Sequence, residues 1–194
     1  MLKNILINCA NLIGRDDIVL ELKKYEKLSD FNDENIKNDI SKLLCFYNFI
    51  TNSIYENYLD LVFCEKIMSD SKSSIDYFKF SKNPIKIIKV ENENFKPIFF
   101  DVKPNCIITN YPNKLLYISY KFLPDAVNDL TDDISYLDRR LIRIVAYGIV
   151  SEFLASNGKI SESESWNKKF LFELFKLKNN KERRLKSTFC LWGK

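Results

Sequence analysis

The apolar residues of this chain change their spacing twice, and that change constrains the fold more than any other feature of the sequence. Up to Tyr58, and again from Ile134, apolar residues recur every three or four positions, which places them on one face of a helix. Between Leu59 and Phe122 this period is replaced by short β-branched and aromatic runs, separated by Asn, Pro and Ser clusters. Separate runs of helices and strands, without alternation, predict an α+β fold.

A helical hairpin is predicted between Ile134 and Leu177. Asn157-Gly158 should end its first helix, because glycine enters the left-handed region at little steric cost. Ser161, with Glu164 three positions later, predicts a capping box at the start of the second helix. Such a hairpin must bury its apolar stripe against another part of the chain.

The expected partner of the hairpin is a long helix from Asp33 to Tyr58, which has the most sustained helical period in the first half of the chain. Two shorter helices precede it, one from Leu2 to a break at Gly14 and one after Asp16. Gly148 lies inside the first hairpin helix, where glycine costs about 1 kcal/mol relative to alanine. We therefore expect Gly148 at a close crossing of two helices.

The turn signals of the central region come at roughly hairpin intervals, which predicts an antiparallel sheet. Leu123-Pro124 ends this region, because the residue before a proline is kept out of helical space. The expected strands are Leu61–Met68, Ile75–Phe80, Ile85–Val90, Pro97–Val102, Asn105–Thr109 and Lys114–Phe122.

Together these patterns predict a helical bundle formed by both chain ends, with an inserted small antiparallel β module and an extended C-terminal tail. The chain of 194 residues is long enough for one sizeable core, or for one core plus a small inserted module. No stretch approaches the ~20 consecutive apolar residues that cross a membrane. The expected parts are 1–58 for the N-terminal helices of the bundle, 59–124 for the β module, 125–177 for the helical hairpin and 178–194 for the basic tail.

The sequence lacks the residues that several kinds of catalysis require. The chain has no histidine, its four glycines are dispersed, and its five cysteines are far apart. The cysteines are expected to be free, buried thiols in a reducing cytoplasm. Two acid pairs, Asp16-Asp17 and Asp132-Asp133, are expected to precede helices and cap their free amides. We therefore expect no catalytic residues, no bound metal and no cofactor.

The net charge of +4 is concentrated in the tail after Leu177, where six basic residues face one acid. The tail ends in an apolar cluster that a merely solvated segment would not need. Binding to a partner is the leading hypothesis, while packing on its own domain, a solvated end and contact with DNA phosphates remain alternatives. The candidate partner-binding residues are Lys181, Arg183, Arg184, Lys186, Phe189, Leu191 and Trp192.

Scattered positions along most of the chain resemble the head-to-tail connector, or adaptor, proteins of tailed bacteriophages. In the hairpin they are Leu141, Ala146-Tyr147-Gly148, Glu152-Phe153, Gly158, Glu164, Trp166 and Phe170. In the central region and the tail they are Pro84-Ile85-Lys86-Ile87, Val90, the Tyr117–Tyr120 strand, Pro124, and Arg183-Arg184 followed by Trp192. The chain departs from the family pattern at Ser69-Asp70-Ser71, where a glycine is expected, and at Asp60, where a proline is expected.

The resemblance implies a structural virion protein with no reaction of its own, made in the host cytoplasm and incorporated at the neck between capsid and tail. By resemblance, many copies, twelve in number, would form a ring under the portal protein, with tail proteins downstream. Genomic DNA would pass through the ring without sequence-specific binding. The tail would reach the portal or a neighbouring subunit, with Trp192 as its anchor and the arginines as polar partners.

Two other classes of protein fit parts of the sequence. A small basic nucleic-acid-binding protein would use the tail together with the Tyr- and Phe-rich β module as a stacking surface. A metal-dependent nuclease would be built on the acid pairs. Steep salt dependence of DNA binding would favour the first, and activity with Mg²⁺ or Mn²⁺ the second.

Overall fold

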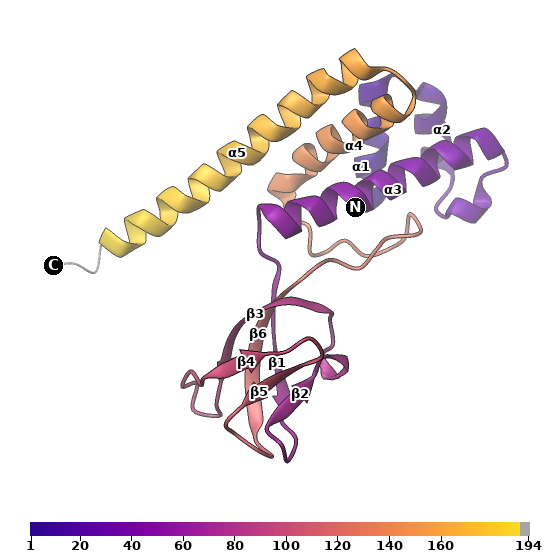
Figure 1. Ribbon diagram of the computed structural model, residues 1–194. Coiled ribbons are helices and arrows are strands. Elements are labelled where there is room, and N and C mark those ends of the chain that lie inside the picture. Colours follow the sequence, from indigo (N-terminus) through magenta and orange to yellow (C-terminus); the bar gives the residue numbers. More distant parts are fainter. Residues whose placement is uncertain (191–194) are drawn as a thin grey trace. The chain divides into compact units, whose positions relative to one another are not determined.

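The protein is α+β, as predicted, with five helices and two small antiparallel sheets in the described part of the chain (Figure 1). The computed structural model describes residues 1–178 with their side chains, and the helical backbone as far as Cys190. The chain forms two compact units. One consists of Leu59–Pro124, and the other of Met1–Tyr58 together with Asp125–Lys194. These boundaries coincide with the two changes in apolar spacing.

Local signals set the ends of the first helices. The helix α1 (Leu2–Ile13) ends at Gly14, whose φ of 73° lies in the left-handed region. The Arg15 N–H donates to the carbonyl of Ala10, which closes a Schellman turn. Helix α2 (Asp16–Lys24) follows directly, and the 3₁₀ turn η1 (Leu28–Asp30) leads into α3 (Glu34–Asn57). The Asp33 carboxylate caps α3 by accepting from the N–H groups of residues 35 and 36.

The central element of the helical unit is α4 (Ile142–Ser156), which contacts α1, α3 and α5 (Ile160–Cys190). Figure 1 shows α4 between α5 and α3. Residues on every side of α4 are therefore buried, and not only the predicted stripe. The expected crossing is confirmed at Gly148, where an added Cβ would lie 2.9 Å from methyl groups of Ile50 on α3. The Cys9 thiol of α1 lies 3.8 Å from the Ala146 carbonyl oxygen on another side of α4.

The first hairpin helix begins later than predicted. The residues from Ile134 to Asp138 are irregular, and a 3₁₀ turn, η3 (Arg139–Leu141), precedes α4. The reason is local, because the Asp133 carboxylate accepts from both the N–H and the hydroxyl of Ser135 and so stabilises a turn. The apolar spacing reflects burial here rather than a helix, since Ile134 is buried within the irregular segment.

The second hairpin helix differs from the prediction at both ends. Gly158, with φ 76°, ends α4 as expected, and the Lys159 N–H donates to the Leu154 carbonyl in a Schellman turn. Helix α5 then begins at Ile160, so Ser161 lies inside the helix and the predicted capping box is absent. The helix also continues to Cys190, where an extended tail was expected after position 177. Lys, Glu, Arg and Leu are good helix formers, and they outweigh the small cost of two asparagines.

The β unit consists of two three-stranded antiparallel sheets, with strand orders β1-β6-β3 and β2-β5-β4. Its apolar core lies between the inward-facing residues Ile67, Ile75, Val90, Ile107 and Ile118. Two strands are shorter than predicted by three residues each: β2 is followed directly by a 3₁₀ turn, η2 (Tyr77–Lys79), and β4 begins only at Phe100. The strands are β1 (Val62–Met68), β2 (Ser74–Asp76), β3 (Pro84–Glu91), β4 (Phe100–Val102), β5 (Cys106–Thr109) and β6 (Leu115–Phe122).

Candidate interaction surfaces

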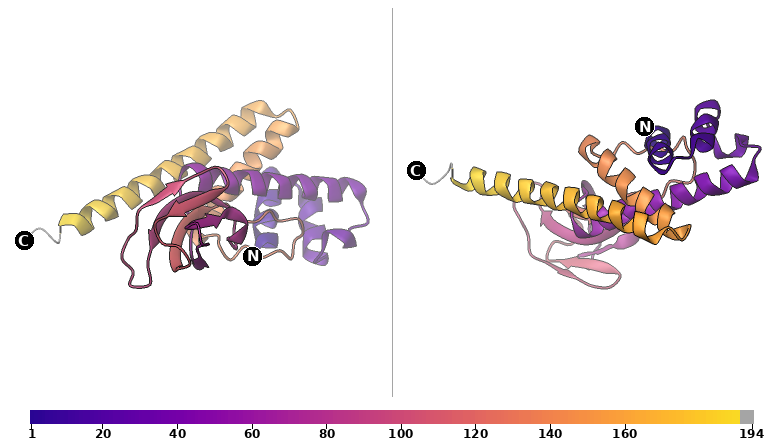
Figure 2. Two further views of the ribbon diagram at one scale, coloured as in Figure 1. Left: turned by 60° about the horizontal axis from the view of Figure 1, so that its bottom comes forward. Right: turned by 90° about the horizontal axis from the view of Figure 1, so that it is seen from above.

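Helix α5 is only partly covered by the other helices of its unit. It has 31 residues, whereas its antiparallel neighbour α4 has 15. In all views α5 continues well past the end of α4 (Figures 1 and 2). Among its described side chains, the buried ones are Ser163, Phe170 and Leu174. The uncovered part of the helix is therefore available for contact with another chain.

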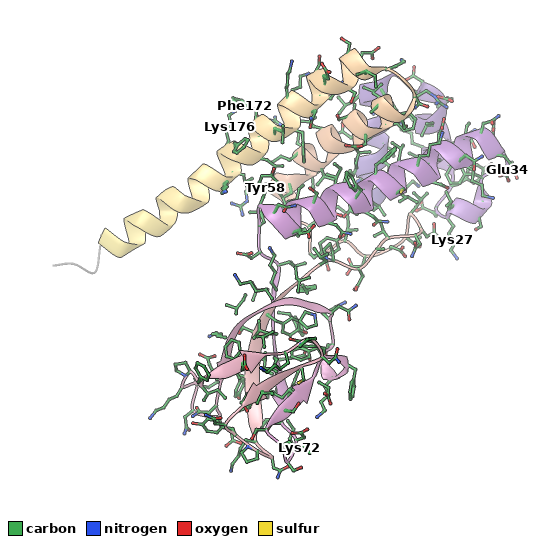
Figure 3. All side chains as sticks on the ribbon, viewed as in Figure 1. Lys27, Glu34, Tyr58, Lys72, Phe172 and Lys176 are labelled. Atoms are coloured by element: carbon green, nitrogen blue, oxygen red, sulfur yellow. The ribbon has the colours of Figure 1, made fainter. Side chains whose placement is uncertain are left out.

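Two phenylalanines of α5 face solvent where this uncovered part begins. Phe172 is 60% exposed and Phe175 is 53% exposed. They are three positions apart, so they lie side by side on the helix surface. The Lys176 ammonium lies 4.1 Å from the centre of the Phe172 ring (Figure 3). Burying a phenylalanine side chain contributes roughly 1.5–3 kcal/mol, so Phe172 and Phe175, called here the α5 aromatic pair, form a strong docking feature.

The hairpin formed by α4 and α5 is held together by stacked aromatic and cationic side chains. The rings of Tyr147 on α4 and Trp166 on α5 have their centres 5.4 Å apart. The Arg143 guanidinium lies 5.7 Å from the centre of the Tyr147 ring, and the Lys169 ammonium lies 3.9 Å from that of Trp166. Arg143 also forms an ion pair of 3.5 Å with Glu173. These contacts support the hairpin and fix the direction in which α5 leaves the bundle.

The seven residues predicted to bind a partner lie outside the described side chains. The backbone of α5 places those up to position 190 on the same helix as the aromatic pair, while Leu191 and Trp192 lie outside the described residues altogether. Phe172 and Phe175 themselves were not singled out from the sequence. An aromatic pair three positions apart, off the stripe of Phe170 and Leu174, was the available signal.

The first acid pair stabilises the start of α2. Contrary to the prediction, Asp16 and Asp17 lie inside the helix, in its first turn, and the N-cap residue Arg15 forms no side-chain capping hydrogen bond. The Arg15 guanidinium donates to the Asp17 carboxylate, and this hydrogen bond is the main reason that the pKa of Asp17 is lowered. Arg15 also forms an ion pair of 2.6 Å with Asp39 on α3, which ties the two helices together.

The second acid pair does not precede a helix, contrary to the prediction. The Asp132 carboxylate accepts from the N–H groups of Asn128 and Asp129, which lowers its pKa, and Asp133 holds the turn at Ser135. Both carboxylates therefore stabilise turns in the segment between the β unit and α4. Among the residues that the structure describes, no three His, Cys, Asp or Glu side chains converge in a way that could hold a metal ion.

The cysteines are free where they are described, but they are not all buried as expected. Cys9 is buried, and this burial raises the pKa of its thiol. Cys45 and Cys64 are exposed, and Cys106 is half-buried. The remaining cysteine, Cys190, lies outside the described side chains. Exposed thiols of this kind are compatible with the expected reducing environment.

No protein family and no curated protein matches the sequence. Within the described residues, none of the helices combines the length and the apolar content that crossing a membrane requires.

Proposed function

We propose that the chain is a structural virion protein, a head-to-tail connector that assembles into an oligomeric ring under the portal of a tailed phage. The ring would lie at the neck of the virion, with tail proteins below it and genomic DNA passing through its channel. In this proposal the protein catalyses no reaction and needs no cofactor.

The observation that carries the proposal is the uncovered part of α5 with its aromatic pair. Phe172 and Phe175 are both more than half exposed and lie next to each other, so they leave an apolar patch in water that a neighbouring subunit or the portal would cover. Because α5 is much longer than α4, its last turns can reach a second chain without disturbing the bundle. The same helix carries the basic residues of positions 178–186, which would supply polar contacts at the rim of the interface.

The first test measures assembly of the purified protein. One chain has a mass of 22.9 kDa, and light scattering after size exclusion, with and without portal protein, reports how many copies associate. We expect assemblies of the wild-type chain, and their loss in the double variant Phe172→Glu with Phe175→Glu, because two buried carboxylates would be strongly unfavourable.

The matched control is Phe49→Glu on α3, since Phe49 is 58% exposed and the substitution is the same. This variant should assemble like the wild type. If the wild-type chain stays monomeric with portal protein present, the connector proposal is wrong. If the double variant assembles normally, α5 does not make the contact.

The second test addresses the tail. Deleting residues 179–194 should abolish binding to the portal and leave the thermal unfolding of the remaining chain intact. The far-UV circular dichroism should fall only by the contribution of the deleted part of α5. Electron microscopy of the chain mixed with portal protein provides the readout. A truncated chain that still joins the portal would contradict the role assigned to Lys181, Arg183, Arg184 and Trp192.

A further inference from the structure

The outer face of the sheet β1-β6-β3 has an aromatic centre. Along β6, Leu116, Ile118 and Tyr120 are completely buried, so the alternate residue Tyr117 belongs to the opposite, outward face. The register places Lys66 of β1 and Glu91 of β3 directly beside Tyr117 on its two sides. A row of one cation, one aromatic ring and one carboxylate therefore crosses this face.

Phe95 adds a second ring to this face from the turn between β3 and β4. The centres of the Phe95 and Tyr117 rings are 4.6 Å apart, and the ring planes are inclined by 38°. The Phe95 ring remains 63% exposed, so it has a face open to solvent. The two rings thus form a small aromatic platform with one free side.

The backbone of Phe95 is strained in a way that core packing does not explain. Its φ is +56°, in the left-handed region that glycine and asparagine prefer and that bulky side chains rarely adopt. The Phe95 N–H donates to the Asn92 carbonyl, and the Asn92 N–H donates to the Lys96 carbonyl, which fixes the turn in this conformation. A glycine would close the same turn without strain. The strained position instead holds an aromatic ring that is mostly exposed, which points to a use of the ring outside the fold.

The charges around the platform have a small positive excess, with Lys66, Lys89 and Lys96 against Glu91 and Glu93. The Lys66 ammonium lies 5.0 Å from the centre of the Tyr117 ring. Lys89 forms an ion pair of 2.9 Å with Glu91 and so neutralises the carboxylate of the row. Lys96 is exposed next to Phe95, while Glu93, in the same turn, is the one opposing charge of that segment. Over residues 59–124, ten lysines face seven acidic residues, so a negatively charged ligand is favoured.

We infer that Phe95 and Tyr117, with Lys66 and Lys96, form a binding site for single-stranded nucleic acid. An unpaired base would stack on the free face of Phe95, and the flanking phosphates would contact the two lysines. Stacking requires only a π-face, so the site would have little sequence preference. A duplex keeps its bases paired and could use only the lysines. This inference goes beyond the connector proposal and does not depend on it.

The test measures binding of the full-length chain to fluorescent oligonucleotides of about 12 nucleotides, a length within the known range of single-strand sites. Fluorescence anisotropy compares a deoxyuridine strand, a uridine strand, which differs from it only in the sugar, and a DNA duplex, each between about 50 and 200 mM salt. We expect both single strands to bind more tightly than the duplex. The stronger of the two identifies the sugar that the site prefers.

The decisive variant is Phe95→Gly, which removes the ring and also relieves the backbone strain. It should weaken single-strand binding about fivefold or more, the loss expected for one stacked base. Its matched control is Phe99→Gly, because Phe99 is 81% exposed in the same unit but precedes β4 of the other sheet. Phe95→Asn provides a second variant that accepts the left-handed conformation. Lys66→Gln should reduce the salt dependence by about one counterion, and Glu93→Gln should strengthen binding.

The inference is overturned if Phe95→Gly binds single strands as tightly as Phe99→Gly, or if the duplex binds as tightly as the single strands. It is also overturned if Phe95→Gly changes the assembled mass without changing oligonucleotide binding, since the platform would then be a contact between copies. The connector proposal is read out separately by assembly with portal protein, so the failure of one does not imply the failure of the other.

Discussion

Gly148 lies where α4 crosses α3, and replacing it with alanine tests the packing that organises the helical unit. An alanine in a helix interior is favoured over glycine by about 1 kcal/mol. At this position, however, the new Cβ would lie 2.9 Å from both Cγ2 and Cδ1 of Ile50, closer than such contacts allow. Ile50 is buried and β-branched, so it has little freedom to move.

The expected magnitude follows from these opposing effects. Overpacking of a well-packed core costs typically about 1–3 kcal/mol. After subtraction of the helix-propensity gain of about 1 kcal/mol, Gly148→Ala should lower the free energy of unfolding by roughly 1 kcal/mol. For a chain of this length, that corresponds to a decrease of about 2–4 °C in the melting temperature.

The sign of the effect should reverse when the clash is removed. In an Ile50→Ala background the new methyl group enters the space that the isoleucine vacated, so Gly148→Ala should then stabilise the chain by about 1 kcal/mol. Urea unfolding followed by far-UV circular dichroism reports mainly on the helical unit and gives all four corners of the cycle. If Gly148→Ala stabilises the wild-type chain as much as the Ile50→Ala variant, the crossing is not tight and the argument fails.

Three further predictions concern single sites. Asn48→Ala should destabilise the chain by about 2 kcal/mol, because the Asn48 amide donates to the Val127 carbonyl and accepts from the Val127 N–H, at 2.8 and 2.9 Å. Urea unfolding without a measurable change in the free energy of unfolding would contradict this. Phe95→Gly should leave the melting temperature nearly unchanged, because relief of backbone strain of about 1 kcal/mol offsets the loss of a ring contact of similar size. A decrease of more than about 2 kcal/mol in the free energy of unfolding would show that the ring serves stability. The hydrogen bonds that Arg140 donates lower the pKa of Asp138 to about 2. The carboxylate therefore stabilises the fold at pH above about 4, and this contribution declines as the pH falls towards 2. Asp138→Asn should flatten that part of the acid unfolding profile, and an unaltered profile would refute the assignment.

Much of the fold could be predicted from the sequence, because the relevant signals are local. Gly14 and Gly158 end helices through backbone conformations that favour glycine, and both helix ends were expected at these residues. Gly148 predicted a close crossing because the cost of a mid-helix glycine must be offset by packing. The prediction of a helix from Ile134 is wrong, because burial in a loop and burial on a helical face can produce the same spacing.

The candidate sites could be predicted less well from the sequence than the fold. The tail residues could be proposed as a site because their charge is read directly from the sequence. The spacing of the α5 aromatic pair is present in the sequence, but its exposure is decided by the tertiary structure, since it depends on where α4 ends. Phe95 gave no signal as an isolated residue, because both its strained φ and its contact with Tyr117 arise from the closure of a turn.

By itself the sequence determined the fold class, the order of helices and strands and the positions of the two changes in pattern, since periodicity and turn chemistry act over a few residues. The tertiary structure alone decided that α4 is buried on all sides, that α5 runs beyond its neighbour and that two rings meet on the outer face of a sheet. These features depend on contacts between residues far apart in the chain, and no local pattern specifies which side chains such contacts leave exposed.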